Sequence, residues 1–454
     1  MTGLNVALNT AVSGLFANQQ AIAATSENIA NVNTADYTRR EARFFTDAIT
    51  GQFAGVDVNI VRAAVDRFLQ GATYRSLADA SATNAIAEGL ARVEASLGAP
   101  GDNISFANEL DRAFAALTTL GANPSSPAAK AEAVSALDAA FAAFSRTRAA
   151  IVTETQAADA QISLDIDRAN ALLKEVWRLN SVVPESDGAA DLLDARLSEL
   201  SKLISITVTR NESGQVEVSA GGQTLANAGG YTELGFAPGT PARLTLSSVN
   251  PDSGGLTEIS ADFGGSIASG EIRGLLDLRN IELPRLDAIV AGAARGVAGQ
   301  LNAVYALNVP VGATAPDVSY GALIVEDADG NFSVNGVIAN DPSRFATARP
   351  GAGGVGGAND GTGAGLLADL GSSAAAGDVR QAVGLIGSAS SNAARAANTN
   401  IALANELTAR ASAQSGVNLD EELSNLIVFQ RAYGANARVI AAIDEMWQAL
   451  VSIL

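Results

Sequence analysis

The chain has 454 residues, a formal net charge of −19, and neither histidine nor cysteine. One hydrophobic core does not extend over this length, so about three or four structural units are expected. The negative charge argues against binding to nucleic acid or to an anionic membrane, because both are bound through basic patches. Without histidine or cysteine, Ser-His-Asp and Cys-His catalysis and nearly all zinc sites are excluded. We expect no metal and no cofactor.

Hydrophobic residues make up 48% of the chain, but aromatic residues only 5%. Alanine is the commonest of these residues; it forms helices readily and buries little area, so long slender helix pairs are favoured. The chain does not open on the basic region of a secretory signal peptide, and it lacks the roughly 18 consecutive apolar residues that would span a membrane. We therefore expect it in the cytosol, or outside the cell after export without a cleaved signal.

The first helix is predicted by apolar, small and amide side chains that recur in steps of 4 and 3 residues. Such a stripe, when sustained over about four heptads, is typical of a coiled-coil seam. One asparagine lies within it, and a buried asparagine in a seam costs stability but fixes register or partner number. The stripe consists of Leu4, Leu8, Ala11, Leu15, Asn18, Ile22, Thr25 and Ile29.

The last stretch, residues 419–454, carries a second stripe of the same spacing, again with one asparagine. We therefore predict that the two ends pair as halves of one helical structure, with the rest of the chain inserted between them. This stripe consists of Leu426, Phe429, Tyr433, Asn436, Ile440, Ile443, Trp447, Leu450 and Leu454.

An apolar helical stripe more often belongs to an ordinary globular core than to an assembly surface. The charge distribution favours assembly here. No charged residue precedes Glu27 and no basic one precedes Arg39, so the outward face of the first helix carries amides and hydroxyls. A helix that faces water usually carries Glu and Lys, whereas the cores of interfaces are depleted in charge. We interpret both ends as surfaces that pack against other protein.

Between the two ends, helical and strand periodicities alternate. Extended chain around a glycine-containing turn is expected between residues 37 and 61. The segment Asp327–Asn331 lacks the glycine and glutamate of an EF-hand loop, so a hairpin turn is predicted there. Residues 351–365 are interpreted as a flexible glycine-rich loop. Helices are predicted over 66–203 with breaks at 98–101, 121–127 and 184–188, over 270–308 and over 378–413, and short strands within 204–270 and at 322–325 and 332–337.

These patterns predict an α+β fold that is mainly α. The chain should be elongated and multi-domain, with paired terminal helices, a long helical bundle domain and small β inserts. The predicted domains are residues 1–60 with 417–454 (terminal coiled coil), 61–203 with 267–308 and 376–416 (helical rod), 204–266 (β insert), and 309–375 (a second, irregular Gly- and Asp-rich β insert).

Both ends carry recognisable motifs. Residues 15–34 (LFANQQAIAATSENIANVNT) and 417–436 (VNLDEELSNLIVFQRAYGAN) resemble the terminal signatures of bacterial flagellar rod, hook and hook-associated proteins. The helical block from Asp66 and the segment 269–279 (SGEIRGLLDLR) narrow the resemblance to the hook-associated protein 1 family. The resemblance covers most of the chain except the β insert and the glycine-rich loop. It departs at residues 35–36, where Ala-Asp replaces the usual Pro-Gly.

The resemblance implies a structural adaptor and not an enzyme: a layer that joins hook to filament on the outside of the cell, after export through the flagellar type III apparatus. Implied partners are further copies of the chain in an axial layer, hook protein, a second junction protein and flagellin on the filament side, and a cytosolic export chaperone. The terminal helices are implied to be largely unfolded in the monomer and to pair on assembly. The implied interface adds Asn31, Asn33, Thr34, Tyr37 and Gln430 to the two stripes.

Three other functions are weighed. The chain could be another axial protein, but flagellin lacks the Asn-Ile-Ala-Asn turn after its first helix and hook protein has a shorter helical middle. A carboxylate-dependent cell-wall glycosidase would need two carboxyl groups about 5–9.5 Å apart in a cleft. The acids here are scattered over helical faces, with few aromatic residues to stack a sugar. A role of the β insert as a binding or adhesive module stays open.

Overall fold

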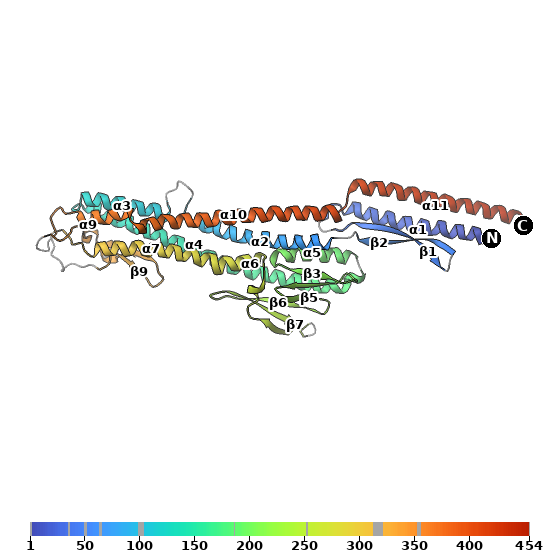
Figure 1. The fold of residues 1–454 in the computed structure, drawn as a ribbon, viewed down its shortest axis with the longest axis horizontal. Helices are drawn as coiled ribbons and strands as arrows, with labels where there is room; N and C mark the ends of the chain where they lie inside the picture. The colour runs from blue at the N-terminus through green and yellow to red at the C-terminus, as the bar shows by residue number, and fades with distance from the viewer. Residues whose placement is uncertain are drawn as a thin grey trace.

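The computed structural model describes residues 2–34, 37–49, 52–62, 66–98, 104–185, 187–250, 253–311, 321–351 and 356–453. The molecule is elongated: a rod of long helices continues at one end into a module built from both ends of the chain, and a small sheet lies against one side of the rod (Figure 1). Among the helices described, none is long and apolar enough to cross a membrane. The predicted fold class, mainly α with small β inserts, is confirmed.

The two ends of the chain form one module with a β-hairpin. Helix α1 (Thr2–Ala30) and helix α11 (Leu419–Ile453) lie side by side and run antiparallel, and strands β1 (Arg40–Ile49) and β2 (Gln52–Arg62) pack against α1 (Figure 1). Gly55 permits this packing, because its φ of 145° suits glycine and a Cβ there would lie 2.3 Å from the Ser13 hydroxyl. We refer to α1, β1, β2 and α11 as the terminal module.

Capping side chains begin three helices of the rod where the sequence breaks the helical pattern. Asp66 accepts hydrogen bonds from two backbone N–H groups of α2, and the hydroxyls of Ser105 and Ser126 each accept one from a backbone N–H group of α3 and α4, respectively. Pro127 occupies the first turn of α4, where its missing N–H is no loss. The rod helices are α2 (Arg67–Ala95), α3 (Phe106–Ala122), α4 (Pro127–Val182), α5 (Asp187–Leu203), α6 (Glu271–Asp277), α7 (Leu283–Tyr305) and α10 (Ala374–Ser415), with a π-turn at Leu278–Glu282 between α6 and α7.

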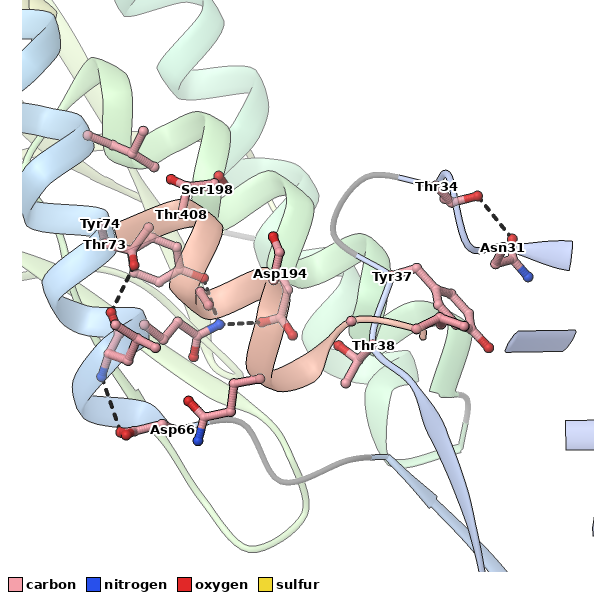
Figure 2. A pocket seen from close by; sticks show the side chains of 18 of the residues that line it. Asn31, Thr34, Tyr37, Thr38, Asp66, Thr73, Tyr74, Asp194, Ser198 and Thr408 are labelled. Atoms are coloured by element: carbon pink, nitrogen blue, oxygen red, sulfur yellow. Dashed lines mark hydrogen bonds between the residues drawn. The ribbon is translucent and has the colours of Figure 1, made fainter. Parts of the chain in front are cut away.

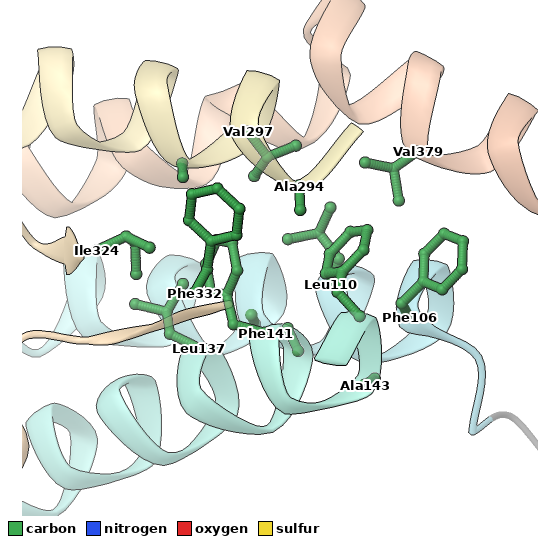
Figure 3. Packing of buried hydrophobic residues seen from close by; sticks show 14 of the residues in the cluster. Phe106, Leu110, Leu137, Phe141, Ala143, Ala294, Val297, Ile324, Phe332 and Val379 are labelled. Atoms are coloured by element: carbon green, nitrogen blue, oxygen red, sulfur yellow. The ribbon is translucent and has the colours of Figure 1, made fainter. Parts of the chain in front are cut away.

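The largest buried cluster fills the end of the rod away from the terminal module. Phe106 and Phe144 stack with ring centroids 4.5 Å apart, and Phe141 lies 6.0 Å from Phe144. Val297 of α7 and Val379 of α10 close the cluster from the other side (Figure 3). The chain has few aromatic residues, and most of those at this end of the rod lie in one core.

The β insert is a six-stranded antiparallel sheet in which each strand pairs with the next along the chain. Its buried positions alternate along β4 and β7, as expected for a sheet with one face on a core. The strands are β3 (Thr207–Arg210), β4 (Val216–Ala220), β5 (Gln223–Asn227), β6 (Gly230–Ala237), β7 (Arg243–Val249) and β8 (Leu256–Ser260).

Asparagine side chains of the rod bind the backbone of the inserts. In each case the amide nitrogen donates to the C=O of one residue, and the amide oxygen accepts from the N–H of that same residue, as a neighbouring strand would. All the distances lie between 2.7 and 3.0 Å. We call these pairs asparagine clamps; they are Asn170–Leu234, Asn180–Val216, Asn280–Ala242 and Asn302–Ile324.

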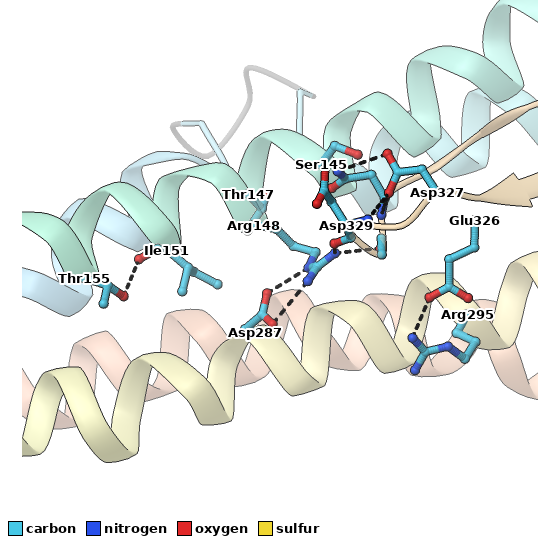
Figure 4. A network of polar contacts seen from close by, with 12 residues as sticks. Ser145, Thr147, Arg148, Ile151, Thr155, Asp287, Arg295, Glu326, Asp327 and Asp329 are labelled. Atoms are coloured by element: carbon cyan, nitrogen blue, oxygen red, sulfur yellow. Dashed lines mark hydrogen bonds and ion pairs between the residues drawn. The ribbon is translucent and has the colours of Figure 1, made fainter. Parts of the chain in front are cut away.

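The second insert carries a hairpin that is tied to the rod. Strands β9 (Ile324–Glu326) and β10 (Phe332–Val334) pair around Asp327–Asn331, which confirms the predicted hairpin turn. Arg148 of α4 links this turn to α7: its Nε donates to Asp287 at 2.8 Å and its Nη1 to the carbonyl of Gly330 at 2.6 Å (Figure 4).

Two predictions for the second insert are wrong. The strand expected to reach residue 337 ends at Val334, because Asn335 caps the short helix α8 (Gly336–Ala339). The loop expected over 351–365 contains the start of helix α9 (Thr362–Ala368). Glycine there serves close packing: a Cβ on Gly361 would lie 2.0 Å from the carbonyl oxygen of Gly121. Helix α10 also begins at Ala374, a turn earlier than the expected residue 378.

Candidate assembly interface

Helices α1 and α11 are in contact, and the side chains of the two predicted stripes differ in burial. On α1, Ala11, Asn18 and Thr25 are buried, while Leu4, Leu8, Leu15, Ile22 and Ile29 are half-buried. On α11, Ile443 is buried, Leu426, Phe429, Asn436, Ile440 and Trp447 are half-buried, and Gln430 and Tyr433 are exposed. Leu454 and the side chain of Leu450 lie outside the described residues.

The two seam asparagines meet at the same level of the module. Asn18 donates to the carbonyl of Gly14 at 2.6 Å, one turn back in α1. The Asn436 amide packs on that glycine so closely that a Cβ on Gly14 would lie 2.8 Å from Nδ2. Gly14 therefore makes room for Asn436, and the paired helices can approach closely at this point.

A row of small residues on α1, which the heptad pattern did not single out, supports the hairpin. Ala17, Ala21 and Ala24 are all buried, and Ala17 lines a hollow together with strand β2. Phe44 of β1 in turn reaches Phe429 of α11, with ring centroids 5.8 Å apart. The hairpin thus contacts both terminal helices.

A fully buried side chain, Asn28, lies where the terminal module meets the rod. Its oxygen accepts from the Tyr37 hydroxyl at 3.0 Å and from the Arg40 N–H at 2.8 Å. Its nitrogen donates to the Arg40 carbonyl and to Glu422, both at 2.9 Å. All of its hydrogen-bonding capacity is therefore used, and its bonds to Arg40 form a fifth asparagine clamp.

Charged side chains extend this cluster in two directions. Arg39 donates to Glu422 at 2.7 Å and to Glu421 at 2.8 Å, which fixes the start of α11. Arg40 donates to Asp191 of α5 at 2.7 Å and so ties the module to the rod. We refer to Asn28, Tyr37, Arg39, Arg40, Asp191 and Glu422 as the joint cluster.

Burial within the joint cluster affects the Tyr37 hydroxyl. Burial, and next the charge of Glu27, raise the pKa of Tyr37 to about 12. The guanidinium of Arg40 lies 5.5 Å from the centre of the Tyr37 ring. Tyr37 therefore remains a neutral hydrogen-bond donor over the physiological pH range.

Of the remaining interface candidates, Asn31 and Thr34 make local bonds that end α1. Thr34 donates to Asn31 at 3.1 Å, and Asn31 donates to the carbonyl of Glu27 at 3.0 Å. Asn33 and Thr34 are exposed. The sequence motif did contain Asn28, but it lies outside the heptad stripe. The sequence did contain one signal for this cluster, namely charge complementarity: Glu421 and Glu422 carry charges opposite to those of Arg39 and Arg40.

A cavity of about 240 Å³ adjoins the joint cluster. It lies between the start of α2, helix α5 and the end of α10, and Figure 2 shows the side chains around it. The two carboxylates in its wall are already engaged: Asp66 caps α2, and Asp194 accepts from Arg210 and Gln70. The polar lining therefore holds the walls together, and it offers no free acid–base pair. Nor do the described residues include any group of three or more acids that could hold a metal ion.

Three family models match separate parts of this architecture. The helical domain of flagellar hook-associated protein FlgK matches residues 90–315, the flagella basal body rod protein model matches residues 8–38, and the FlgEFG C-terminal model of the basal body rod matches residues 409–453. The chain belongs to the flagellar hook-associated protein 1 family. The helical match spans the rod from the end of α2 to α7 together with the β insert, and the two shorter matches cover most of α1 and all of α11.

Similar proteins carry the same description. Flagellar hook-associated protein 1 of Escherichia coli is 25% identical over 61% of this chain and 52% of its own length. The Salmonella typhimurium protein of the same name is 26% identical over 65% of this chain and 56% of its own length. The aligned part thus spans about half of these relatives. The Bacillus subtilis protein is 23% identical over 100% of this chain and 99% of its own. The solved flagellar hook junction protein FlgK from Burkholderia pseudomallei shares the fold, with a TM-score of 0.61 at 15% identity over 78% of this chain and all of that one.

Proposed function

We propose that this chain is a structural component of the bacterial flagellum that joins the hook to the filament as an adaptor layer. One observation carries the proposal: the ends of the chain form a paired module that exposes several large apolar side chains. Phe16 of α1 is 57% exposed, and Val428 and Met446 of α11 are 59% and 51% exposed. Apolar exposure of this kind on two neighbouring helices is typical of a surface that other protein covers.

The proposed partners follow from this role. Copies of the chain pack in an axial layer that contacts hook protein on one side, and a second junction protein and flagellin on the other. An export chaperone holds the chain in the cytosol, and the working location is outside the cell. The β insert, which lies on one side of the rod in Figure 1, would face outward. The role requires no catalytic reaction.

Assembly would be coupled to folding of the terminal module. The seam contains alanine, asparagine and threonine at several inward positions, so its helices bury little apolar area. Isolated helices gain most of their stability from packing, and ordering them has an entropic cost. Neighbouring copies would supply the missing contacts, so that order is complete only in the layer.

Electron microscopy of cells that lack this chain tests the proposal. We expect intact hooks without filaments, and restoration of filaments by the unaltered chain. A chain with Trp447→Arg places a charge in the seam and should fail to restore them, although its rod stays folded. Normal filaments in cells without the chain would refute the proposed function.

A further inference from the structure

Phe68, in the first turn of α2, is an aromatic side chain that its own chain leaves almost uncovered. It is 89% exposed, the highest value among the large apolar side chains of the described residues. An aromatic ring carries a large apolar area, which proteins usually place in a core or in the centre of an interface. Since the core of this chain does not take up the ring, we expect another protein surface to cover it.

Two exposed arginines accompany Phe68 on the outer side of α2. Arg67 precedes it, and Arg75 lies two helical turns further along the same face, where its Nε donates to the carbonyl of Gly71 at 3.2 Å. Asp79 follows after one more turn on that face. The start of α2 is therefore both basic and aromatic on its outer side, in a chain whose net charge is −19.

The cavity beside the joint cluster, here called the joint cavity, is large enough for one aromatic ring. Its volume is about 240 Å³, whereas a cavity of about 150 Å³ can hold benzene. Leu69, Leu77 and Val417 line it with apolar side chains, and Ser198 and Thr408 line it with hydroxyls (Figure 2). Its described lining comes from the rod helices and from the segments that join them to the terminal module, and includes no residue of α1 or α11.

The charges around the joint cavity suit a ring that is flanked by arginines. The described lining includes two acids, Asp66 and Asp194, and neither lysine nor arginine. Asp194 is bonded to Arg210, and Arg410 on α10 is paired with Glu406, so these two bases are already matched with acids. An arginine that approaches the lining would therefore meet carboxylates and hydroxyls, which favours association.

Phe68 and the joint cavity lie at the same height of the rod and on different sides of α2. Leu69 and Gln70, which line the cavity, directly follow Phe68 in the helix. Each residue of a helix is rotated by about 100° from the one before it, so Phe68 is turned well away from both. Copies that stand side by side would therefore bring the ring of one to the cavity of the next without a shift along the rod.

We propose that Phe68 of one copy inserts into the joint cavity of the next copy in the layer. The contact joins the rod of one copy to the joint of its neighbour, and the terminal helices take no part in it. Because the ring and the cavity are different surfaces, the contact is heterologous and can be repeated from copy to copy. Residues 31–38 and 416–417 bound the cavity, so the inserted ring also holds the neighbour's terminal module against its rod. The inference rests on the proposed function and adds a specific contact to it.

Two substitutions of Phe68 test the ring. In cells that lack the native chain, Phe68→Ala should reduce the fraction of hooks that bear filaments by roughly tenfold or more, because buried aromatic anchors supply much of the binding energy of an interface. Phe68→Leu keeps an apolar side chain of similar size and should stay within about threefold of the unaltered chain. Immunoblots of the culture medium verify that both variants are exported, and circular dichroism verifies that the rod is folded.

Two matched threonines of α10 test the cavity. Thr408 lines it, whereas Thr399 lies outside its lining, and both are exposed. Thr408→Trp would fill the space that the ring needs, so the filament-bearing fraction should fall by roughly tenfold or more, as with Phe68→Ala. Thr399→Trp should stay within about twofold of the unaltered chain.

The outcomes separate this inference from the proposed function. Loss of filaments in cells without the chain, followed by full restoration with Phe68→Ala, would overturn the contact and leave the function standing. Equal losses with Thr408→Trp and Thr399→Trp would overturn the assignment of the cavity. If cells without the chain bear normal filaments, the proposed function itself fails.

Disulfide cross-linking identifies the two surfaces directly, because the chain contains no cysteine of its own. Cells are given equal amounts of a chain with Phe68→Cys and a chain with Thr408→Cys or Ser198→Cys, and their flagella are isolated and oxidised. Two cysteines bridge only when their Cα atoms lie within about 7 Å. We expect dimers in at least one mixture and none with Phe68→Cys alone. Dimers with Phe68→Cys alone, or none in either mixture, would overturn the proposed contact.

Discussion

Asn28 of α1 and Glu422 of α11 are 394 positions apart in the chain, yet their side chains share a hydrogen bond of 2.9 Å. The same amide binds both backbone groups of Arg40 at the start of the hairpin. Glu422 is only 2% exposed and also accepts from Arg39. The first and last helices are therefore joined at the rod end of the module by one buried polar group, in addition to the seam.

Removal of that amide should loosen the terminal module. Asn28→Ala leaves the Glu422 carboxylate and the Arg40 backbone with unmade buried bonds, which costs about 1–3 kcal/mol for each such group. In the assembled layer we expect faster amide exchange in β1 and in the first turns of α11, with α4 unchanged. Asn33→Ala is the control, because Asn33 is exposed. Unaltered protection in the Asn28 variant would contradict the role assigned to the joint cluster.

Two glycines of α1 should respond to alanine with opposite signs. At Gly14 the new Cβ would lie 2.8 Å from the Asn436 amide, so the variant should lose about 1–2 kcal/mol. At Gly3 no atom lies within 4 Å, so Gly3→Ala should stabilise the helix by about 0.5–1 kcal/mol. Urea unfolding of the assembled layer, monitored in the terminal module, measures both changes.

A double substitution tests the Gly14 contact directly. Adding Asn436→Ala to Gly14→Ala removes the obstructing amide, so the two changes together should cost less than the sum of each alone. Additive costs would show that Gly14 and Asn436 do not contact each other.

Asp165 in α4 should make the rod sensitive to pH. This side chain is 5% exposed, Gln161 donates to one of its oxygens, and the other oxygen has no partner among the described residues. Burial, and next the charge of Glu271, raise the pKa of Asp165 to about 6. Because the pKa is higher in the folded state, stability is lost as pH rises from about 4 to 6, and the penalty persists above that.

Asp165→Asn should remove this penalty while keeping the bond from Gln161. We expect the variant to be more stable than the native chain by about 1–3 kcal/mol at pH 7.5, and by much less at pH 4.5. Urea unfolding at the two pH values provides the comparison. A difference that is the same at both pH values would show that ionisation of Asp165 is not its source.

If the terminal helices fold only on assembly, the amides of the dilute monomer should differ in their protection from hydrogen exchange. Amides of α1 and α11 should exchange rapidly, whereas those of α4, whose inward side chains fill two cores, should be protected. Hydrogen exchange followed by mass spectrometry resolves these segments in one experiment. Slow exchange in both terminal helices of the monomer would contradict folding on assembly.

The elements that local chemistry determines could be predicted from the sequence. The heptad spacing after residue 419 gave α11, and glycine with proline at 121–127 gave the break before α4. Seam residues such as Asn18 and Ile443 could be proposed because a 4–3 spacing is visible in any helix. These signals need no knowledge of what lies nearby.

The features that depend on a distant neighbour could not be predicted. Asn28 belongs to no stripe, and its role follows from Tyr37, Arg40 and Glu422, which meet only in the folded chain. Gly361 was interpreted as flexible, but it permits the close approach of Gly121. Glycine serves both purposes equally well, and only the partner distinguishes them.

The asparagine clamps have a consequence for how this architecture can diversify. Each clamp holds a strand by its main chain, which is the same for every amino acid except proline. The outward-facing side chains of the β insert could therefore change widely, while the insert remains docked through Asn170, Asn180 and Asn280 and through its buried face. Evolution or a protein engineer can therefore alter the outer face of the sheet without redesigning the helices beneath it.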